Sequence, residues 1–318
     1  MYNQFFGLQK SPFSMTPDPE LLFLPPQHRE ALAGLTYAIL NRKGFGVLIG
    51  EAGTGKTTLL ARILKSLPIS RIHSSVILNP TLTANEFLEL VLLDFGISEV
   101  PDSKARRLIM LQRLLLQNHS ENRVSVLVID EAHKLSPVLL EEIRLLSNFE
   151  FGDQKLLQIV LSGQSELTGI LNQNELRQLK QRICVRLAIG PLAKPEIEQY
   201  IRHRWVKCGG SSTLPFSAPA LDAIAEFSQG IPRIINAICD NALSIAFGLA
   251  AKTIEVAHIA EVARDLDLKR PLVIPPPRVE LTPSTKNLQA PLRVSEAETA
   301  TEPQLSFFAR WTRKARLT

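Results

Sequence analysis

Residues 50–57 read GEAGTGKT, and this stretch decides the fold. It follows the apolar run FGVLI at residues 45–49, and a helix-forming segment begins near Lys56. The letters fit the pattern G-x-x-x-x-G-K-[ST], in which a glycine-rich loop joins a buried strand to a helix. Glycines let backbone N–H groups turn toward phosphate oxygens, and the helix presents its positive end to the same anion. The stretch therefore predicts a phosphate-binding loop.

Each residue of this loop has an expected role toward a nucleoside triphosphate. We expect Lys56 to contact the β- and γ-phosphates and Thr57 to hold Mg²⁺. The absence of a guanine-reading Asn-Lys-x-Asp stretch favours ATP as the nucleotide, with GTP as the alternative. The predicted nucleotide-binding set is Gly50, Glu51, Ala52, Gly53, Thr54, Gly55, Lys56, Thr57 and Thr58.

Two adjacent carboxylates, Asp130 and Glu131, end the apolar run VSVLVI at residues 124–129. An aspartate at the end of a buried strand beside a phosphate loop is placed to orient Mg²⁺ through its water shell. The adjacent glutamate can position and deprotonate an attacking water. The alternative is that both carboxylates cap the next helix. The letters DEAH at residues 130–133 also occur in a helicase class, but that class needs a second lobe of strands.

Five short apolar runs, rich in β-branched residues and bounded by Gly, Pro, Asn or Asp, predict five buried strands. Helical patterns separate them, one beginning after Ser103, which predicts a parallel sheet covered on both faces. The fold class is then a three-layer α/β/α P-loop nucleotide-binding domain with a five-stranded parallel sheet. The runs occupy residues 45–49, 75–78, 124–129, 157–161 and 185–189.

Beyond Pro191 the strand pattern stops and four helical patterns follow, at residues 194–206, 218–229, 232–250 and 255–266. The sequence thus predicts an α/β domain over residues 1–190 and an all-helical lid over residues 191–270. The remaining 48 residues carry seven of the 21 prolines. Residues 271–318 are therefore predicted to be a proline-rich linker and a disordered tail.

A polar residue after the fourth strand is a candidate sensor of the γ-phosphate. Residues 162–164 read Ser-Gly-Gln, and we favour Gln164 over Ser162 because Gln164 lies one step further out of the sheet. The alternative is a polar turn into the next helix.

Arginines just before and within the fifth strand are candidates for a finger that reaches a neighbouring subunit's nucleotide. The guanidinium fork can neutralise charge on the transferred phosphoryl group, which raises turnover by about 10³–10⁵-fold. Arg182 is the first choice and Arg177 the second, with Arg186 nearby. The alternative is that they are solvated surface charges.

The lid pattern contains GIPRIIN at residues 230–236, where a helix begins at Pro232. A cation in the first turn of a helix is mildly unfavourable against the helix dipole, which suggests a compensating anion. In a lid folded over the phosphate loop, that anion is the nucleotide. We therefore expect Arg233 to point at the γ-phosphate, with Gly230 and Pro232 fixing the chain's entry into the helix.

Composition describes a globular, mildly basic chain. Of its 318 residues, 45% are hydrophobic and 21% charged, and the net charge is +5. Cys184, Cys208 and Cys239 form no metal-binding cluster, which fits a reducing compartment. The N-terminus has no basic start, apolar core or cleavage site, so we expect no signal peptide and a cytoplasmic protein.

These motifs, in this order, resemble the AAA+ ATPases. Residues 2–39, the stretch LQIVLSGQSEL at 157–167 and GIPRIINAICDNAL at 230–243 resemble the general secretion pathway protein A (ExeA) type, with MshM-like and exosortase-associated relatives. The resemblance implies an ATP-driven assembly factor at the inner face of a bacterial envelope, working as a homo-oligomeric ring or partial ring with a protein partner. It also implies that residues 1–40, including Phe13 and residues 17–19, pack near the adenine.

The tail ends LSFFARWTRKARLT at residues 305–318, with apolar and basic residues at helical spacing. Such a segment can lie on an anionic membrane or dock into a partner groove, and disorder is the alternative. Family members of the secretion type continue into a membrane span and a peptidoglycan-binding domain. Neither is present in this sequence, so we do not expect it to bind the cell wall directly.

Three functions remain open on these observations. The first is an ATPase for envelope machinery, located in the cytoplasm or peripherally at the inner membrane. The second is a DNA-associated AAA+ ATPase of the transposition or initiator type, which the basic balance allows. The third is a nucleotide-dependent binding module with little turnover.

Overall fold

The five apolar runs form one parallel sheet in the computed structural model, which describes residues 2–68, 70–78 and 80–268. The strands are β1 (Phe45–Ile49), β2 (Ile72–Ile77), β3 (Val124–Ile129), β6 (Leu157–Gly163) and β7 (Ile183–Ala188). Their order across the sheet is β2-β3-β6-β1-β7. Ile49 pairs with Gly163, and Ile129 with Leu161, so the residues that follow these strands meet at one sheet edge. The predicted fold class is confirmed.

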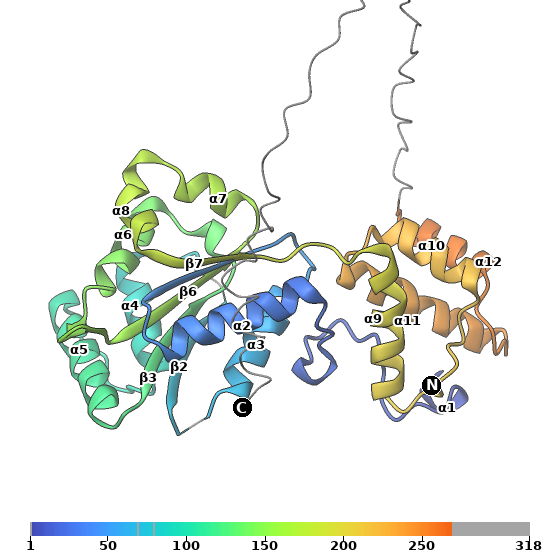
Figure 1. Cartoon of the computed structure of the whole chain (residues 1–318), viewed down its shortest axis with the longest axis horizontal. Coiled ribbons are helices and arrows are strands. Elements are labelled where there is room, and N and C mark those ends of the chain that lie inside the picture. The colour runs from blue at the N-terminus through green and yellow to red at the C-terminus, as the bar shows by residue number, and fades with distance from the viewer. Residues whose placement is uncertain (1, 69, 79, 269–318) are drawn as a thin grey trace, which may run out of the picture. The chain divides into compact units, whose positions relative to one another are not determined.

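Alternating side chains of the strands build two separate cores. Leu127 and Ile129 face α4 (Ala84–Asp94), α5 (Lys104–Ser120), α6 (Pro137–Leu146), α7 (Glu166–Leu171) and α8 (Arg177–Arg182). Val126 and Val128 face α2 (Pro26–Leu40) and α3 (Lys56–Ser66) on the other side. Figure 1 shows α2 and α3 in front of the strands. This period of two is what strands impose on side chains, and it produces the three layers.

Some local structure differs from the sequence-based expectation. β2 and β7 begin three and two residues earlier than predicted, because polar residues such as His73 still pair with the neighbouring strand. A short hairpin of β4 (Glu150–Phe151) and β5 (Gln154–Lys155) precedes β6 and was not predicted. The connecting 3-10 turns η1 (Pro19–Leu21), η2 (Ala132–Lys134) and η3 (Asn174–Leu176) were not predicted either.

Four helices follow the sheet and bury one another's apolar faces. They are α9 (Lys194–Lys207), α10 (Ala218–Ser228), α11 (Pro232–Gly248) and α12 (Val256–Asp265). Each lies within two residues of its predicted ends. The chain divides into two units, Met1–Leu272 and Val273–Thr318, and both the sheet and these helices belong to the first. The predicted proline-rich linker and disordered tail, with the basic amphipathic segment at residues 305–318, fall outside the described residues. The domain boundaries at 190 and 270 stay predictions.

Part of the N-terminal segment packs into the helical region, and its expected position beside the adenine stays a prediction. α1 (Tyr2–Phe5) contacts α11, and Leu8, Phe13 and Leu21 are buried in the core of the helical region. Phe13 is fully buried, with its ring against that of Phe216. The segment's few apolar side chains follow no period, so the sequence could not assign them to a core. α2, at the end of the predicted 1–40 segment, packs on the sheet.

The burial of Phe13 gives a stability prediction. Phe13→Ala should lower the free energy of unfolding by about 3–5 kcal/mol, because it leaves a cavity in the helical core. Urea unfolding followed by circular dichroism measures this change. Phe151→Ala is the matched control, since that ring is 58% exposed and its loss should cost under about 0.5 kcal/mol. Equal effects of the two substitutions would contradict the packing described.

Candidate nucleotide site

The loop between β1 and α3 has the backbone shape that a phosphate requires. Gly53 and Gly55 adopt left-handed conformations, with φ of 80° and 99°. A Cβ atom added to Gly53 would lie 2.8 Å from the Cβ of Arg233, so a side chain has no room there. Only glycine takes these angles without strain. The loop then leads directly into α3, whose first residue is Lys56.

Lys56 lies inside this loop. Its ammonium donates hydrogen bonds to the carbonyl oxygens of Gly50, at 2.7 Å, and Glu51, at 3.0 Å. Burial lowers the pKa of Lys56, while the nearby carboxylates of Asp130 and Glu131 raise it. A buried cation among backbone groups suits a multiply charged anion, so the residues present fit a polyphosphate.

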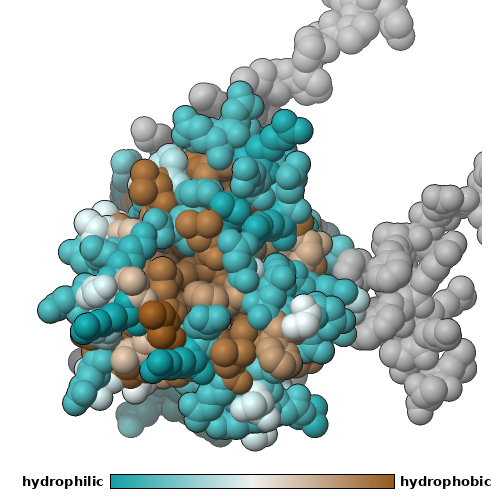
Figure 2. All heavy atoms as spheres, turned by 90° about the vertical axis from the view of Figure 1, so that its left-hand side faces the viewer, coloured by the Kyte–Doolittle hydropathy of each residue, from teal (hydrophilic) through white to brown (hydrophobic). Residues whose placement is uncertain are grey.

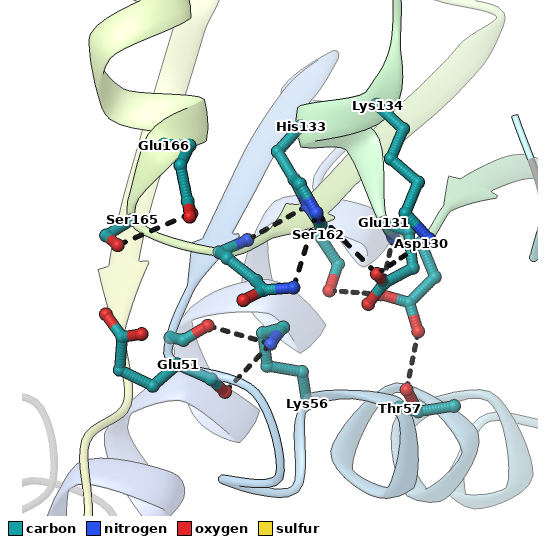
Figure 3. Close-up of polar contacts among 12 residues, drawn as sticks. Glu51, Lys56, Thr57, Asp130, Glu131, His133, Lys134, Ser162, Ser165 and Glu166 are labelled. Carbon is teal, nitrogen blue, oxygen red and sulfur yellow. Dashed lines mark hydrogen bonds and ion pairs between the residues drawn. The ribbon is translucent and has the colours of Figure 1, made fainter. Parts of the chain in front are cut away.

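Asp130 joins β3 to α3 and β6 through its two carboxylate oxygens (Figure 3). Thr57 Oγ1 donates to Asp130 Oδ2 at 2.5 Å, and Ser162 Oγ donates to Asp130 Oδ1 at 2.7 Å. The side-chain oxygens of Thr57 and Asp130 are therefore adjacent, and oxygen ligands are what Mg²⁺ takes. Ser162, which was set aside as a sensor, instead holds the carboxylate of Asp130.

Glu131 occupies a left-handed conformation, with φ of 54° and ψ of 32°, at the start of η2. A non-glycine residue with positive φ is uncommon and marks a local constraint. Its carboxylate lies 3.4 Å from Lys134 Nζ and 3.7 Å from His133 Nε2. Because of this left-handed turn, the side chains of Glu131 and Asp130 point in different directions.

Gln164 contacts His133 as well as the cavity. Its backbone N–H donates to His133 Nδ1 at 3.3 Å, and its side-chain amide lies 3.3 Å from Nε2. His133 thus links Gln164 to Glu131, as Figure 3 shows. The sequence carried no signal for this link beyond the letters DEAH.

One cavity of about 540 Å³ gathers these groups. Lys56, Thr57, Glu131 and Gln164 line it, together with residues of the N-terminal segment and the helical region. At the start of α11, the backbone N–H of Arg233 donates to the carbonyl of Gly53 at 3.2 Å. The predicted lid residue therefore touches the phosphate loop directly, and its side chain lines the same cavity.

Several residues of the N-terminal segment line this cavity. Residues 14–18 and 21–23 line it, whereas Phe13 does not. The resemblance implied that Phe13 and residues 17–19 pack near the adenine, and of these only Pro17 and Asp18 lie on the cavity wall. His28 joins this wall and places its Nε2 atom 3.0 Å from the carbonyl oxygen of Thr54.

Arg182 does not line the cavity. Its Nη1 atom lies 2.5 Å from Ser147 Oγ and 3.3 Å from the carbonyl oxygen of Arg144, at the end of α6. Arg177, at the start of α8, is exposed. Within this chain Arg182 therefore contacts α6, and the finger in a neighbouring subunit stays a prediction for both arginines.

The sequence relationships agree with this geometry. Residues 39–171 match the AAA domain family. General secretion pathway protein A of Aeromonas hydrophila is 41% identical over 267 residues, which cover 84% of this chain and 48% of that protein. The chain carries an AAA domain of the general secretion pathway protein A type. It spans about half the length of that relative.

Solved structures share the fold of this AAA protein. Aeropyrum pernix ORC2 aligns with a TM-score of 0.62 at 16% identity, covering 81% of this chain and 72% of that one. Pyrobaculum aerophilum Cdc6p gives 0.59 at 18% identity, covering 78% and 71%. The Thermotoga maritima RuvB Holliday junction branch migration motor gives 0.54 at 20% identity, covering 78% and 71%. At these identities the likeness concerns the fold alone.

Proposed function

We propose that this AAA protein binds ATP with Mg²⁺ and hydrolyses the bond to the γ-phosphate. The observation that carries the proposal is that Lys56, Thr57 and Glu131 line one cavity, where Thr57 is hydrogen-bonded to Asp130. Lys56 and the loop N–H groups hold the phosphates, and Glu131 accepts a proton from the attacking water. Thr57 and Asp130 would hold Mg²⁺, which supplies positive charge to the phosphate oxygens when bound.

Gln164 and Arg233 complete this proposed site from two different elements. Gln164 follows β6 and lies on the cavity wall, where its amide can contact the γ-phosphate or the attacking water. Arg233 begins α11, so a contact with the γ-phosphate would join the helical region to the hydrolysed bond. Release of that phosphate would then change how the lid is held.

The role of Arg233 gives a binding prediction. Arg233→Ala should weaken ATP binding by about 10-fold or more and leave ADP binding nearly unchanged, because only ATP offers the γ-phosphate to the guanidinium. Equilibrium titrations with ADP and a non-hydrolysable ATP analogue measure the ratio. Arg202→Ala on α9 is the control, since that arginine pairs with Glu198 at the surface. An unchanged ratio of the two affinities in Arg233→Ala would mean that Arg233 does not contact the γ-phosphate and has a structural role.

Self-association through the outer face of the α/β region is part of the proposal. Figure 2 views the side of α4, α5 and α6 and displays apolar side chains among polar ones. Exposed apolar residues on these elements and on β4 are Leu90, Leu93, Ile109, Val138, Leu145 and Phe151. Exposed apolar clusters favour protein contacts. In such an assembly Arg182 or Arg177 would reach the neighbouring nucleotide.

The biological setting is proposed from the resemblance. The relative is a general secretion pathway protein, which supports an assembly or remodelling role in bacterial envelope machinery, with a protein partner at the inner face of the membrane. Among the described residues, no helix is long and apolar enough to cross a membrane. Contact with an anionic membrane through residues 305–318 stays a prediction. DNA association is the second candidate, because fold neighbours include a structure with DNA.

Rates of ATP hydrolysis under three conditions distinguish the envelope function from the DNA-associated function. ATP hydrolysis is measured for the full chain alone, with duplex DNA and with anionic liposomes. If the protein serves envelope machinery, DNA should not change the rate of ATP hydrolysis. Anionic liposomes should either raise that rate or leave it unchanged. Steep stimulation by DNA that is lost at high salt would favour the DNA-associated function instead.

A further inference from the structure

Three buried polar side chains of the helical region line the cavity but have no part in the proposed hydrolysis. Tyr200 and Arg204 stand one turn apart on α9, and Asn236 lies on α11. Their exposed fractions are 5%, 6% and 8%. Buried polar groups cost free energy unless they are hydrogen-bonded, so their partners indicate what the cavity holds.

The direction of their hydrogen bonds is fixed. Arg204 Nη1 lies 3.3 Å from the Tyr200 hydroxyl, and a guanidinium can only donate. The tyrosine oxygen therefore accepts from Arg204 and gives its own hydrogen to Asn236 Oδ1, at 2.8 Å. Burial raises the pKa of Tyr200, which keeps this hydroxyl protonated. The oxygen of the Asn236 amide thus faces the tyrosine.

Arg204 is itself anchored to the N-terminal segment. Its Nε atom donates to the carbonyl of Pro12 at 2.6 Å, and its guanidinium lies 5.6 Å from the ring centre of Tyr200. The relay from Arg204 through Tyr200 to Asn236 therefore starts at a fixed cation. It ends at Asn236 Nδ2, which bonds to no other residue in the part of the chain that the structure describes.

The position of Asn236 on α11 indicates which part of the nucleotide it meets. Arg233, whose backbone touches the phosphate loop, lies three residues earlier on the same helix face. Three residues advance a helix by about 4.5 Å. Asn236 therefore lies about one turn further along α11, next to Tyr200. The ring centre of Tyr200 is 6.1 Å from that of Phe23, in the N-terminal wall of the cavity. With the phosphates at the loop, as proposed above, the nucleoside would lie at this end of the cavity.

We propose that Asn236 Nδ2 donates a hydrogen bond to an acceptor atom of the nucleoside, either a purine ring nitrogen or a ribose oxygen. Tyr200 and Arg204 are positioning residues that hold the amide in this orientation. The inference rests on the proposed nucleotide function and adds a contact that ATP and ADP share. Arg233 would read the γ-phosphate, while Asn236 would read the nucleoside from the same helix face.

The test compares the binding of ADP and of a non-hydrolysable ATP analogue, each with Mg²⁺, to full-length variants. Asn236→Asp keeps the side-chain shape and the bond from Tyr200, but it turns an acceptor oxygen toward the ligand. Affinity for both nucleotides should fall equally, by about 10-fold or more. Tyr200→Phe removes the group that orients the amide and should cost about 3-fold for both.

Two controls accompany these variants. Asn241→Asp changes the same residue type on the same helix. The Asn241 amide donates to the carbonyl of Ala237 and does not line the cavity, so this variant should bind as the wild type does. Thermal melting of Asn236→Asp within a few degrees of the wild type shows that the fold is kept. Unchanged affinity in Asn236→Asp, or a loss confined to the ATP analogue, overturns the inference. A wild type that binds neither nucleotide overturns the proposed function as well.

Analogues of ADP identify the acceptor atom. Asn236→Ala and the wild type are titrated with ADP and with analogues that lack a ribose hydroxyl or replace ring N1, N3 or N7 by carbon. The analogue that both proteins bind equally lacks the partner of Asn236. If Asn236→Ala lowers the affinity by the same factor for ADP and for every analogue, none of these atoms is the partner of Asn236. That result would place its contact at the phosphates and contradict the inference.

Discussion

Glu131→Gln should bind ATP as tightly as the wild type and lose hydrolysis by about 10²–10⁴-fold, the usual contribution of a general base. The amide keeps the size of the side chain but cannot accept the proton of the attacking water. Lys56, Thr57 and Asp130 are untouched, so the phosphate and Mg²⁺ contacts persist. Phosphate release under saturating ATP measures turnover, and titration with an ATP analogue measures binding.

Glu166→Gln is the matched control for this substitution. Glu166 is an exposed residue at the start of α7, near Gln164, and its carboxylate lies 3.5 Å from Ser165 Oγ. It should hydrolyse ATP at close to the wild-type rate. Undiminished turnover in Glu131→Gln would mean that another group activates the water.

Lys56→Ala should lose nucleotide binding by about 100-fold, because charge-assisted hydrogen bonds to phosphate contribute about 1.5–3 kcal/mol each. The fold should tolerate the change, since the removed ammonium is a buried cation whose pKa burial already lowers. Fluorescent ADP titration measures the affinity, and thermal melting checks the fold.

Lys65→Ala on the same helix serves as the comparison. Its ammonium pairs with Glu20 at the surface, 2.6 Å away, and both side chains are more than half exposed. Such pairs are worth about 0–1 kcal/mol, so nucleotide affinity should not change. Similar affinities in Lys56→Ala and Lys65→Ala would contradict the assignment of the phosphate loop.

Local patterns explain what the sequence could predict. The loop at residues 50–57, the ends of β1 and β3, and the start of α11 at Pro232 depend on nearest neighbours along the chain. Periodicity was enough for the five strands and four late helices. The proposed roles of Lys56, Thr57, Asp130 and Glu131 follow from motifs. In the structure three of these residues line one cavity, and Asp130 is hydrogen-bonded to Thr57.

Tertiary packing explains what the sequence could not predict. Phe13 lies in the helical core against Phe216, which is about 200 residues later in the sequence. The bond from Ser162 to Asp130 depends on strands β3 and β6 being neighbours. The relay from Arg204 to Asn236 joins three residues on two helices, which no short pattern connects.

The most direct test of the ATPase assignment is phosphate release from ATP by the full-length protein with Mg²⁺, with and without a chelator. The geometry of Lys56, Thr57, Asp130 and Glu131 predicts steady turnover that the chelator abolishes and that Lys56→Ala lacks. Release at the same rate from wild type and Lys56→Ala, or none from wild type at any protein concentration, would contradict it.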